Sequence, residues 1–131
     1  MKARILVIED NPANLALMTY LLTAFQHSVV TTCDGVEGLE IAQRELPDLI
    51  ICDIHLPKID GYEVARQLKQ SASPSLRAIP LVGVTALAMP GDRDKVLAAG
   101  FDGYIAKPIE PQTFVQQCEA FILARPRQSP S

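Results

Sequence analysis

Polar residues that phosphoryl chemistry can use stand at the ends of four short apolar segments of this sequence. They are Glu9 and Asp10 after Arg4–Ile8, Asp53 after Leu49–Cys52, Thr85 after Leu81–Val84, and Lys107 after Gly103–Ala106. If the four segments are parallel strands of one sheet, these side chains meet at one edge, because the carboxyl ends of parallel strands lie together. Three carboxylates, a hydroxyl and an ammonium at one place are the groups that metal-assisted phosphorylation of an aspartate requires.

The three carboxylates would repel one another and raise one another's pKa values unless a cation lay between them. A hard divalent cation relieves this repulsion, and Mg²⁺ binds a few carboxylate oxygens while keeping several waters. We therefore predict a Mg²⁺ site, in which Mn²⁺ can substitute. Asp10 and Asp53 are the predicted direct ligands, and Glu9 is predicted to act through a water.

Asp53 is the predicted nucleophile, because a carboxylate oxygen can attack phosphorus and form an acyl phosphate. The metal on one side and Lys107 on the other would neutralise the added negative charge. The hydroxyl of Thr85 would donate a hydrogen bond to a phosphate oxygen. Asp53, Lys107 and Thr85 are thus the candidate catalytic residues.

Each of these residues also has an ordinary structural explanation. Asp10 could belong to the cap of a helix that begins at the next two residues, and Asp53 could open a turn. Thr85 suits any strand, and Lys107 could be a solvated surface lysine. The phosphorylation hypothesis is favoured because the structural explanations are unrelated to one another and would all have to apply at strand ends of the same sheet.

Apolar runs alternate along the chain with segments of helical periodicity. The expected strands are 5–8, 28–32, 48–52, 79–84 and 104–106, and the expected helices follow Asn11, cover 38–44, 62–68 and 92–99, and open at Pro111. Strands joined through helices form parallel pairs. This order predicts an α/β fold, a flavodoxin-like (βα)5 doubly wound parallel sheet with strand order 2-1-3-4-5. Ligands bind such sheets at the switch point, here between the strands that end at Glu9-Asp10 and at Asp53.

Smaller expectations concern residues away from these strand ends. The first helix is expected to place these side chains on one apolar face: Leu15, Met18, Leu22 and Phe25. His27 is expected to be a solvated residue of the loop that follows, and residues 71–75 are expected to form a polar loop.

The composition favours one globular domain. The chain has 131 residues, of which 48% are hydrophobic and 21% charged, and its net charge is −3. This balance gives no basic surface for nucleic acid, and no apolar run is long enough to span a bilayer. The sequence from Met1 shows no signal peptide, so we expect a cytoplasmic protein. The cysteines have no CxxC spacing and are expected to be small core residues: Cys33, Cys52 and Cys118.

Five short motifs accompany the polar residues. They are Ile8-Glu-Asp-Asn11, Asp53-Ile-His-Leu-Pro57 with Asp60-Gly61, Val84-Thr-Ala86, Ala99-Gly-Phe-Asp102 and Lys107-Pro108. Through them the chain, from Arg4 to about Leu123, resembles the CheY-like receiver domain of two-component response regulators. The stretch from Thr85 to Gly91 is most similar to DivK-type single-domain regulators and to the receivers of hybrid kinases.

The resemblance implies a role for each acidic residue. Glu9 and Asp10 would be acids of the metal site, and Asp53 would be the phosphorylated residue. The main-chain carbonyl of His55 would be a further metal ligand, while its side chain would flank the phosphate and affect the rate of hydrolysis.

The resemblance also implies roles for residues of the later strands. Thr85 and Lys107 would contact the phosphate, and Tyr104 would be the aromatic residue that is coupled to Thr85 in a switch. The peptide bond before Pro108 would be cis. Leu87 would flank the phosphate together with His55, which lies two positions after Asp53.

The implied function is a phosphorylation switch in two-component phosphorelay signalling. A histidine kinase or a histidine phosphotransfer protein would donate the phosphoryl group. The protein would not be a turnover enzyme, because it would catalyse only its own phosphotransfer and slow dephosphorylation. A downstream protein, or a second copy in a homodimer, would bind the face formed by the helix at 92–99, the strand at 104–106 and the last helix. Neither nucleic acid nor a membrane is an expected partner.

Two other functions stay open at this point. A receiver-like scaffold could bind partners without phosphorylation, although the complete set of polar groups argues against it. A phosphatase of the haloacid-dehalogenase type would need an acid two residues after the nucleophile, where this chain has His55.

We expect residues 1–124 to form the receiver domain and 125–131 a flexible tail. The start at Met1 favours a stand-alone receiver over one cut from a hybrid kinase.

Overall fold

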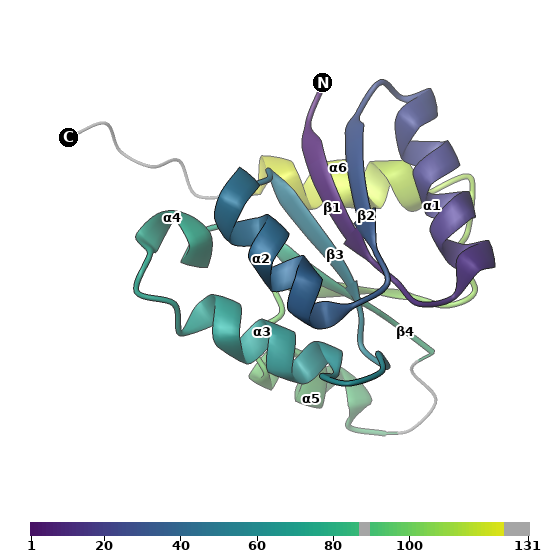
Figure 1. Cartoon of the computed structure of the whole chain (residues 1–131). Helices are drawn as coiled ribbons and strands as arrows, with labels where there is room; N and C mark the ends of the chain where they lie inside the picture. Colours follow the sequence, from purple (N-terminus) through teal and green to yellow (C-terminus); the bar gives the residue numbers. More distant parts are fainter. Residues whose placement is uncertain (87–89, 125–131) are drawn as a thin grey trace.

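A computed structural model describes residues 1–86 and 90–124 of the protein. Its strands form one parallel sheet in the order β2-β1-β3-β4-β5 (Figure 1). They are Arg4–Ile8 (β1), Ser28–Thr32 (β2), Leu49–Asp53 (β3), Leu81–Thr85 (β4) and Gly103–Ala106 (β5). The predicted doubly wound α/β fold and its strand order are therefore confirmed.

Helices cover both faces of the sheet, as parallel sheets require. In the described ranges they are Pro12–Ala24 (α1), Gly35–Glu45 (α2), Gly61–Lys69 (α3), Pro74–Arg77 (α4), Asp92–Ala98 (α5) and Phe114–Leu123 (α6). Helices α1 and α6 pack on one face, and α2 to α5 pack on the other. Figure 1 looks onto the second face, with α2 and α3 in front of the strands and α6 behind them.

The central strands are buried on both faces because successive side chains point to opposite sides. Leu6 and Ile8 of β1 contact the apolar cluster beneath α2 and α3, whereas Ile5 and Val7 contact the cluster beneath α1 and α6. All four are at most 1% exposed. This double burial is why short, continuous apolar runs predicted the strands.

Helix α1 begins where the sequence predicted it, directly after the acidic pair Glu9-Asp10. The side chain of Asn11 accepts a hydrogen bond from the backbone N–H of Asn14 at 3.0 Å, and Pro12 occupies the first turn. Because the helix starts so soon after β1, both acids stay in the short connection at the carboxyl edge of the sheet.

Several predicted element boundaries were wrong, among them the start of α2, which begins at Gly35 rather than at 38. Residues 71–75 were expected to form a polar loop, but the one-turn helix α4 begins at Pro74. The hydroxyl of Ser73 caps this turn by accepting the N–H of Leu76, whose side chain is buried. The last helix begins at Phe114, three residues after Pro111, because a turn precedes it.

Two side chains are more exposed than predicted. Phe25 lies at the end of α1 with 57% of its surface exposed, because the helix stops before this residue can pack inward. Cys33 is exposed in the connection after β2, whereas Cys52 and Cys118 are buried as predicted.

The tail predicted at 125–131 lies outside the described residues. None of the helices described is long and apolar enough to cross a membrane.

His27 is buried, with 3% of its surface exposed, so the solvated position predicted for it was wrong. Its Nδ1 accepts the N–H of Ala3 at 3.0 Å, and its Nε2 lies 2.8 Å from Oε2 of Glu119 on α6. Gln26, at φ 71°, ends the turn after α1 and directs the next side chain inward. Because Nδ1 acts as an acceptor, Nε2 carries the proton and donates to Glu119.

Replacing His27 with alanine should lower the free energy of unfolding by about 1–3 kcal/mol, because the buried N–H of Ala3 loses its acceptor. Chemical denaturation followed by circular dichroism measures this change. His55→Ala is the matched control, because His55 is the other histidine and is exposed. It should change the free energy of unfolding by less than about 0.5 kcal/mol. Equal stability of the two variants would show that the His27 contacts do not stabilise the fold.

Candidate functional site

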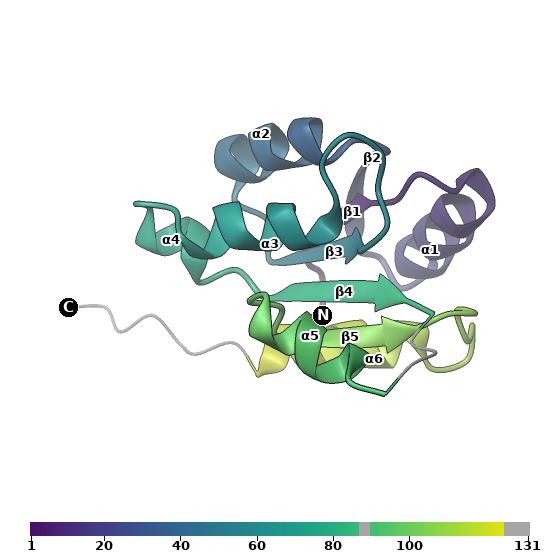
Figure 2. The ribbon, with the colours of Figure 1, turned by 90° about the horizontal axis from the view of Figure 1, so that it is seen from below.

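The register of the sheet brings the predicted strand ends to one edge. The paired residues nearest that edge are Ile8 with Cys52, Asp53 with Val84, and Thr85 with Ala106. Figure 2 shows the arrowheads of β3, β4 and β5 pointing the same way. The residues that end or follow these strands therefore lie together at the carboxyl edge.

Three acidic side chains form a cluster at this edge. Glu9, Asp10 and Asp53 each offer a carboxylate oxygen, and these oxygens all lie within 4.8 Å of one another. Glu9 and Asp53 are buried, whereas Asp10 is exposed. The structure thus brings together the three acids that the sequence analysis placed in a metal site.

Lys107 supplies the positive charge of the cluster. Its Nζ lies 3.2 Å from Oδ2 of Asp53 and 3.4 Å from Oε1 of Glu9. Its backbone N–H donates to the carbonyl of Thr85 at 2.9 Å, which fixes the residue at the end of β5. The following Lys107–Pro108 peptide bond is cis, as the resemblance implied.

The electrostatics of the site centre on Glu9, which has 0% exposure. The pKa of Glu9 is raised to about 7, mainly by burial and also by the neighbouring Asp53, while the N–H of Asn11 and the charge of Lys107 oppose the shift. The N–H of Asn11 donates to Oε2 at 3.1 Å. The other oxygen, Oε1, is buried and accepts no hydrogen bond from the described residues.

This donor set fits a hard divalent cation. Carboxylate oxygens are the ligands that Mg²⁺ prefers, and a cation would satisfy the buried Oε1 of Glu9 while relieving repulsion among the acids. Mg²⁺ also retains waters in its shell, which suits a cluster with one exposed member, Asp10.

Asp53 is held in place by its own chain. The backbone N–H of His55 donates to Oδ1 of Asp53 at 3.0 Å, so the carboxylate orientation depends on the segment that follows β3. Gly61, at the start of α3, lies so close that a Cβ there would be 2.6 Å from the carbonyl oxygen of Asp53. Only glycine allows α3 to begin directly against the end of β3.

Thr85 and Tyr104 lie on the same face of the sheet. Tyr104 pairs with Gly83 and Thr85 pairs with Ala106, so the two side chains are on neighbouring strands, two residues apart in register. Thr85 is buried, and Tyr104 is half-buried against the apolar cluster beneath α3 and α5. Leu87, which the resemblance places beside the phosphate, lies outside the described residues.

One charged pair at this edge was not predicted from the sequence. Lys58, in the segment between β3 and α3, lies 3.1 Å from Asp34, which precedes α2. The two residues are 24 positions apart, and neither ends an apolar run, so no local pattern connects them. The only sequence signal was that Asp34 suits a helix N-cap.

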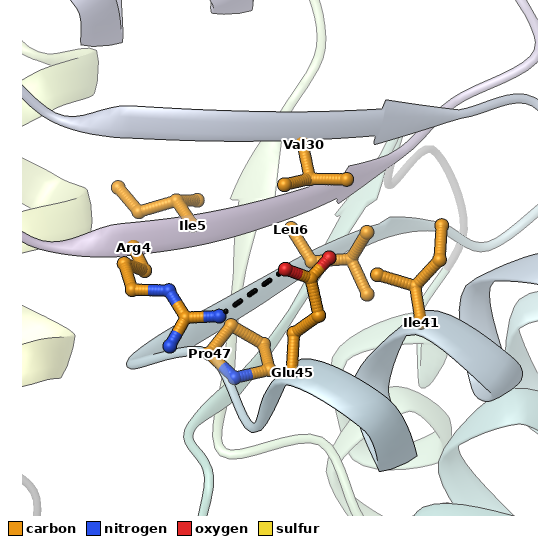
Figure 3. A pocket seen from close by; sticks show the side chains of 7 residues that line it. All are labelled: Arg4, Ile5, Leu6, Val30, Ile41, Glu45 and Pro47. Carbon is orange, nitrogen blue, oxygen red and sulfur yellow. Dashed lines mark hydrogen bonds and ion pairs between the residues drawn. The ribbon is translucent and has the colours of Figure 1, made fainter.

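A small pocket lies at the opposite, amino edge of the sheet (Figure 3). Its apolar walls come from β1, β2 and α2, and an ion pair of 3.4 Å between Arg4 and Glu45 crosses it. The space inside it is about 10 Å³, which is enough for no more than one water and far too little for a small molecule. None of the predicted site residues lines this pocket, so the acidic cluster remains the candidate site.

Several known proteins are similar to this chain in sequence or in structure. The family model of the response regulator receiver domain matches residues 5–119. The polar-differentiation response regulator DivK of Brucella anthropi is 36% identical over 122 residues, which are 93% of this chain and 98% of that protein. A CheY-like receiver domain protein from Methanospirillum hungatei is 26% identical, with a TM-score of 0.83 over 95% of this chain and 97% of that chain.

A further similar structure is the receiver domain of a sensor histidine kinase from Pseudomonas aeruginosa, solved with a magnesium ion coordinated in its active site cleft. It is 31% identical, with a TM-score of 0.84 over 95% of this chain and 100% of that chain. The family match spans every described strand except the first residue of β1, and so contains all of the strand-end residues described above. The chain therefore belongs to the family of response regulator receiver domains, the signalling modules of two-component systems.

Proposed function

We propose that the protein accepts a phosphoryl group on Asp53 from a histidine kinase or a histidine phosphotransfer protein, and that this changes its partner binding. The observation that carries the proposal is the environment of Asp53. Its buried carboxylate lies in the acidic cluster with Glu9 and Asp10, and 3.2 Å from Nζ of Lys107. Residues 1–124 would act as one receiver domain.

In the proposed reaction a carboxylate oxygen of Asp53 attacks the phosphorus atom of a phosphohistidine. The oxygen–phosphorus bond forms while the phosphorus–nitrogen bond breaks, and the electron pair of the broken bond stays on the imidazole nitrogen of the donor. Glu9, Asp10, Asp53 and the main-chain carbonyl of His55 would hold Mg²⁺ or Mn²⁺. The bound cation would neutralise negative charge on the carboxylates and on the phosphoryl oxygens.

Lys107 and Thr85 would stabilise the phosphoryl group after it arrives. The ammonium of Lys107 already contacts the Asp53 carboxylate, so it is placed to contact an oxygen of the new acyl phosphate. Thr85 ends the neighbouring strand β4, and its hydroxyl would donate to another phosphoryl oxygen.

A gel that retards phosphoproteins distinguishes this function from a scaffold that works without phosphorylation. After incubation with acetyl phosphate and Mg²⁺, a slower band should appear. A scaffold would show no such band under any condition of metal or donor.

Replacing Lys107 or Thr85 with alanine should impair phosphorylation without unfolding the protein. The fold should survive the loss of Lys107 because this side chain is 23% exposed and because the buried Glu9 can take up a proton once the ammonium is gone. Thermal melts should stay cooperative, with midpoints within about 5 °C of wild type. The Lys107→Ala variant should form phosphorylated protein at least about tenfold more slowly. A variant that loses the cooperative melt would show that its residue serves folding rather than chemistry.

Phosphorylation is expected to change the surface at Tyr104. A phosphate on Asp53 would attract the Thr85 hydroxyl, and the half-buried ring of Tyr104, on the same face of the sheet, would move to a more buried position. NMR shifts of the Tyr104 ring, with and without beryllofluoride and Mg²⁺, measure this movement. A ring and a Thr85 segment that stay unchanged at full occupancy would contradict the switch, while leaving phosphorylation of Asp53 untouched.

The surface formed by α5, β5 and α6 is the proposed binding face for a downstream protein or a second copy. Tyr104 belongs to β5, so a movement of its ring would alter this surface directly. The contacts of the phosphoryl group with Thr85 and Lys107 are what would favour one state over the other, because a ligand shifts an equilibrium only through differential contacts.

A further inference from the structure

Two connections at the carboxyl edge are joined by a pair of charged side chains. Asp34 lies between β2 and α2, and Lys58 lies between β3 and α3. Nζ of Lys58 donates to Oδ2 of Asp34 at 3.1 Å. In Figure 2 the segment that follows β3 arches away from the sheet before it enters α3, and this ion pair joins that arch to the start of α2.

Asp34 is fixed on its own side of the pair. Its Oδ1 accepts the N–H of Val36 at 2.7 Å, which caps α2, and its backbone N–H donates to the hydroxyl of Thr32 at 3.2 Å. The hydrogen bond from Lys58 holds the pKa of Asp34 below its usual value. The Asp34 carboxylate is therefore oriented by the backbone at the start of α2.

Lys58 occupies a backbone conformation that side-chain-bearing residues rarely adopt. Its φ of 66° lies in the left-handed region, and such a residue persists only where its surroundings hold it. The next residue, Ile59, packs against Gly35, where a Cβ would lie 2.9 Å from Cγ1 of Ile59. The ion pair and this close packing together hold the strained turn against α2.

The held segment carries the backbone of the candidate site. It begins at Asp53, and the N–H of His55 donates to the Asp53 carboxylate. It ends where the N–H of Gly61 donates to the carbonyl of Ile54 at 2.8 Å. A shift of Lys58 would therefore be transmitted to the peptide groups on both sides of His55, whose carbonyl the proposed function assigns to the metal.

We propose that Lys58 is a positioning residue, which with Asp34 clamps the segment from Ile54 to Gly61 so that the site is preorganised for a divalent cation. This inference rests on the proposed function. Lys58 would contact neither the metal nor the phosphoryl group. It would favour cation binding through the geometry of the segment rather than through its own charge.

Two variants separate geometry from charge. Lys58→Gln removes a positive charge near the acidic cluster, so a purely electrostatic effect would strengthen Mg²⁺ binding. Asp34→Asn removes a negative charge, so the same effect would weaken binding, although asparagine still caps α2. If the pair acts as a clamp, both variants should weaken Mg²⁺ binding, and the double variant should be no weaker than either single one.

Calorimetric titration with Mg²⁺ measures these affinities. Each single variant and the double variant should bind about threefold more weakly than wild type. Arg4→Gln is the matched control, because it breaks an exposed ion pair of similar length at the opposite edge and removes one positive charge. It should leave the affinity unchanged. Opposite shifts for the two single variants, with additive effects in the double variant, would overturn the proposal, and so would unchanged affinities in both.

Hydrogen exchange in the metal-free protein tests the clamp without any cation. The N–H groups of His55 and Gly61 should exchange about threefold faster in both single variants than in wild type and in Arg4→Gln. Unchanged exchange at both positions would contradict the clamp. If wild type bound no Mg²⁺, the proposed function would fail, whereas the exchange rates would still decide whether Lys58 and Asp34 hold the segment.

Discussion

Replacing Asp53 with asparagine is expected to abolish phosphorylation of the protein. Asparagine keeps the shape of the side chain and can still accept the N–H of His55, but its amide is not a nucleophile for phosphorus. After incubation with acetyl phosphate and Mg²⁺, intact-mass spectrometry should show one added phosphoryl group on wild type. The Asp53→Asn variant should show none.

Asp60→Asn is the matched control for this experiment. Asp60 lies in the same segment and caps α3 by accepting the N–H of Glu63 at 3.0 Å. Asparagine caps helices as well as aspartate does, so the control should be labelled like wild type. Equal labelling of the Asp53→Asn variant would show that the phosphoryl group is attached elsewhere.

Removal of the divalent metal is expected to have an equally large effect. Three carboxylates at the strand ends repel an incoming phosphoryl group, and a cation is needed before the two can approach. Excess EDTA should therefore prevent labelling of wild type, and Asp10→Ala should prevent it even at millimolar Mg²⁺. Because Asp10 is exposed, this variant should keep the wild-type fold. Labelling that survives EDTA would exclude the metal mechanism.

The affinity for Mg²⁺ should rise with pH until about pH 7. Glu9 has a pKa raised to about 7 in the metal-free fold, so below that pH the side chain is mostly protonated and must lose a proton as the cation binds. Above pH 7 it is already a carboxylate, so the affinity should level off. Calorimetric titrations between pH 5.5 and 8.5 give this profile, and Glu9→Gln should flatten it.

The fold and the polar groups of the site could be predicted because both depend on local patterns. A strand buried on two faces must be apolar along its whole length, as Leu49–Cys52 is, so the first polar residue marks its end. Parallel strands then place those ends together. Local patterns were therefore enough to place Asp53, Thr85 and Lys107 at one edge.

The remaining features depend on contacts between distant parts of the chain. His27 is buried because Ala3 and Glu119, 24 and 92 positions away, satisfy its two nitrogens. A histidine in a short loop carries no sign of such partners. Similarly, the ion pair of Asp34 and Lys58 depends on how α2 packs beside the segment after β3, which no periodicity encodes.

The burial that gives Glu9 its raised pKa is a third property that could not be predicted from the sequence. Glu9 and Asp10 are adjacent acids that look equivalent in the sequence, and Glu9 was predicted to act through a water. In the fold Glu9 is fully buried beneath the edge while Asp10 is exposed, so burial separates the two acids electrostatically. Because both residues are carboxylic acids, the residue types do not encode that difference.

Borohydride reduction followed by peptide mass spectrometry tests the central claim most directly. Sodium borohydride converts an aspartyl phosphate to homoserine and leaves a free aspartate unchanged, so it marks the acceptor by residue. Wild-type protein treated with acetyl phosphate and Mg²⁺ should show this conversion at Asp53 and at no other aspartate, and protein treated in EDTA should show none. An unconverted Asp53 in protein that carries a phosphoryl group, or a phosphoryl group found on His55, would contradict the account.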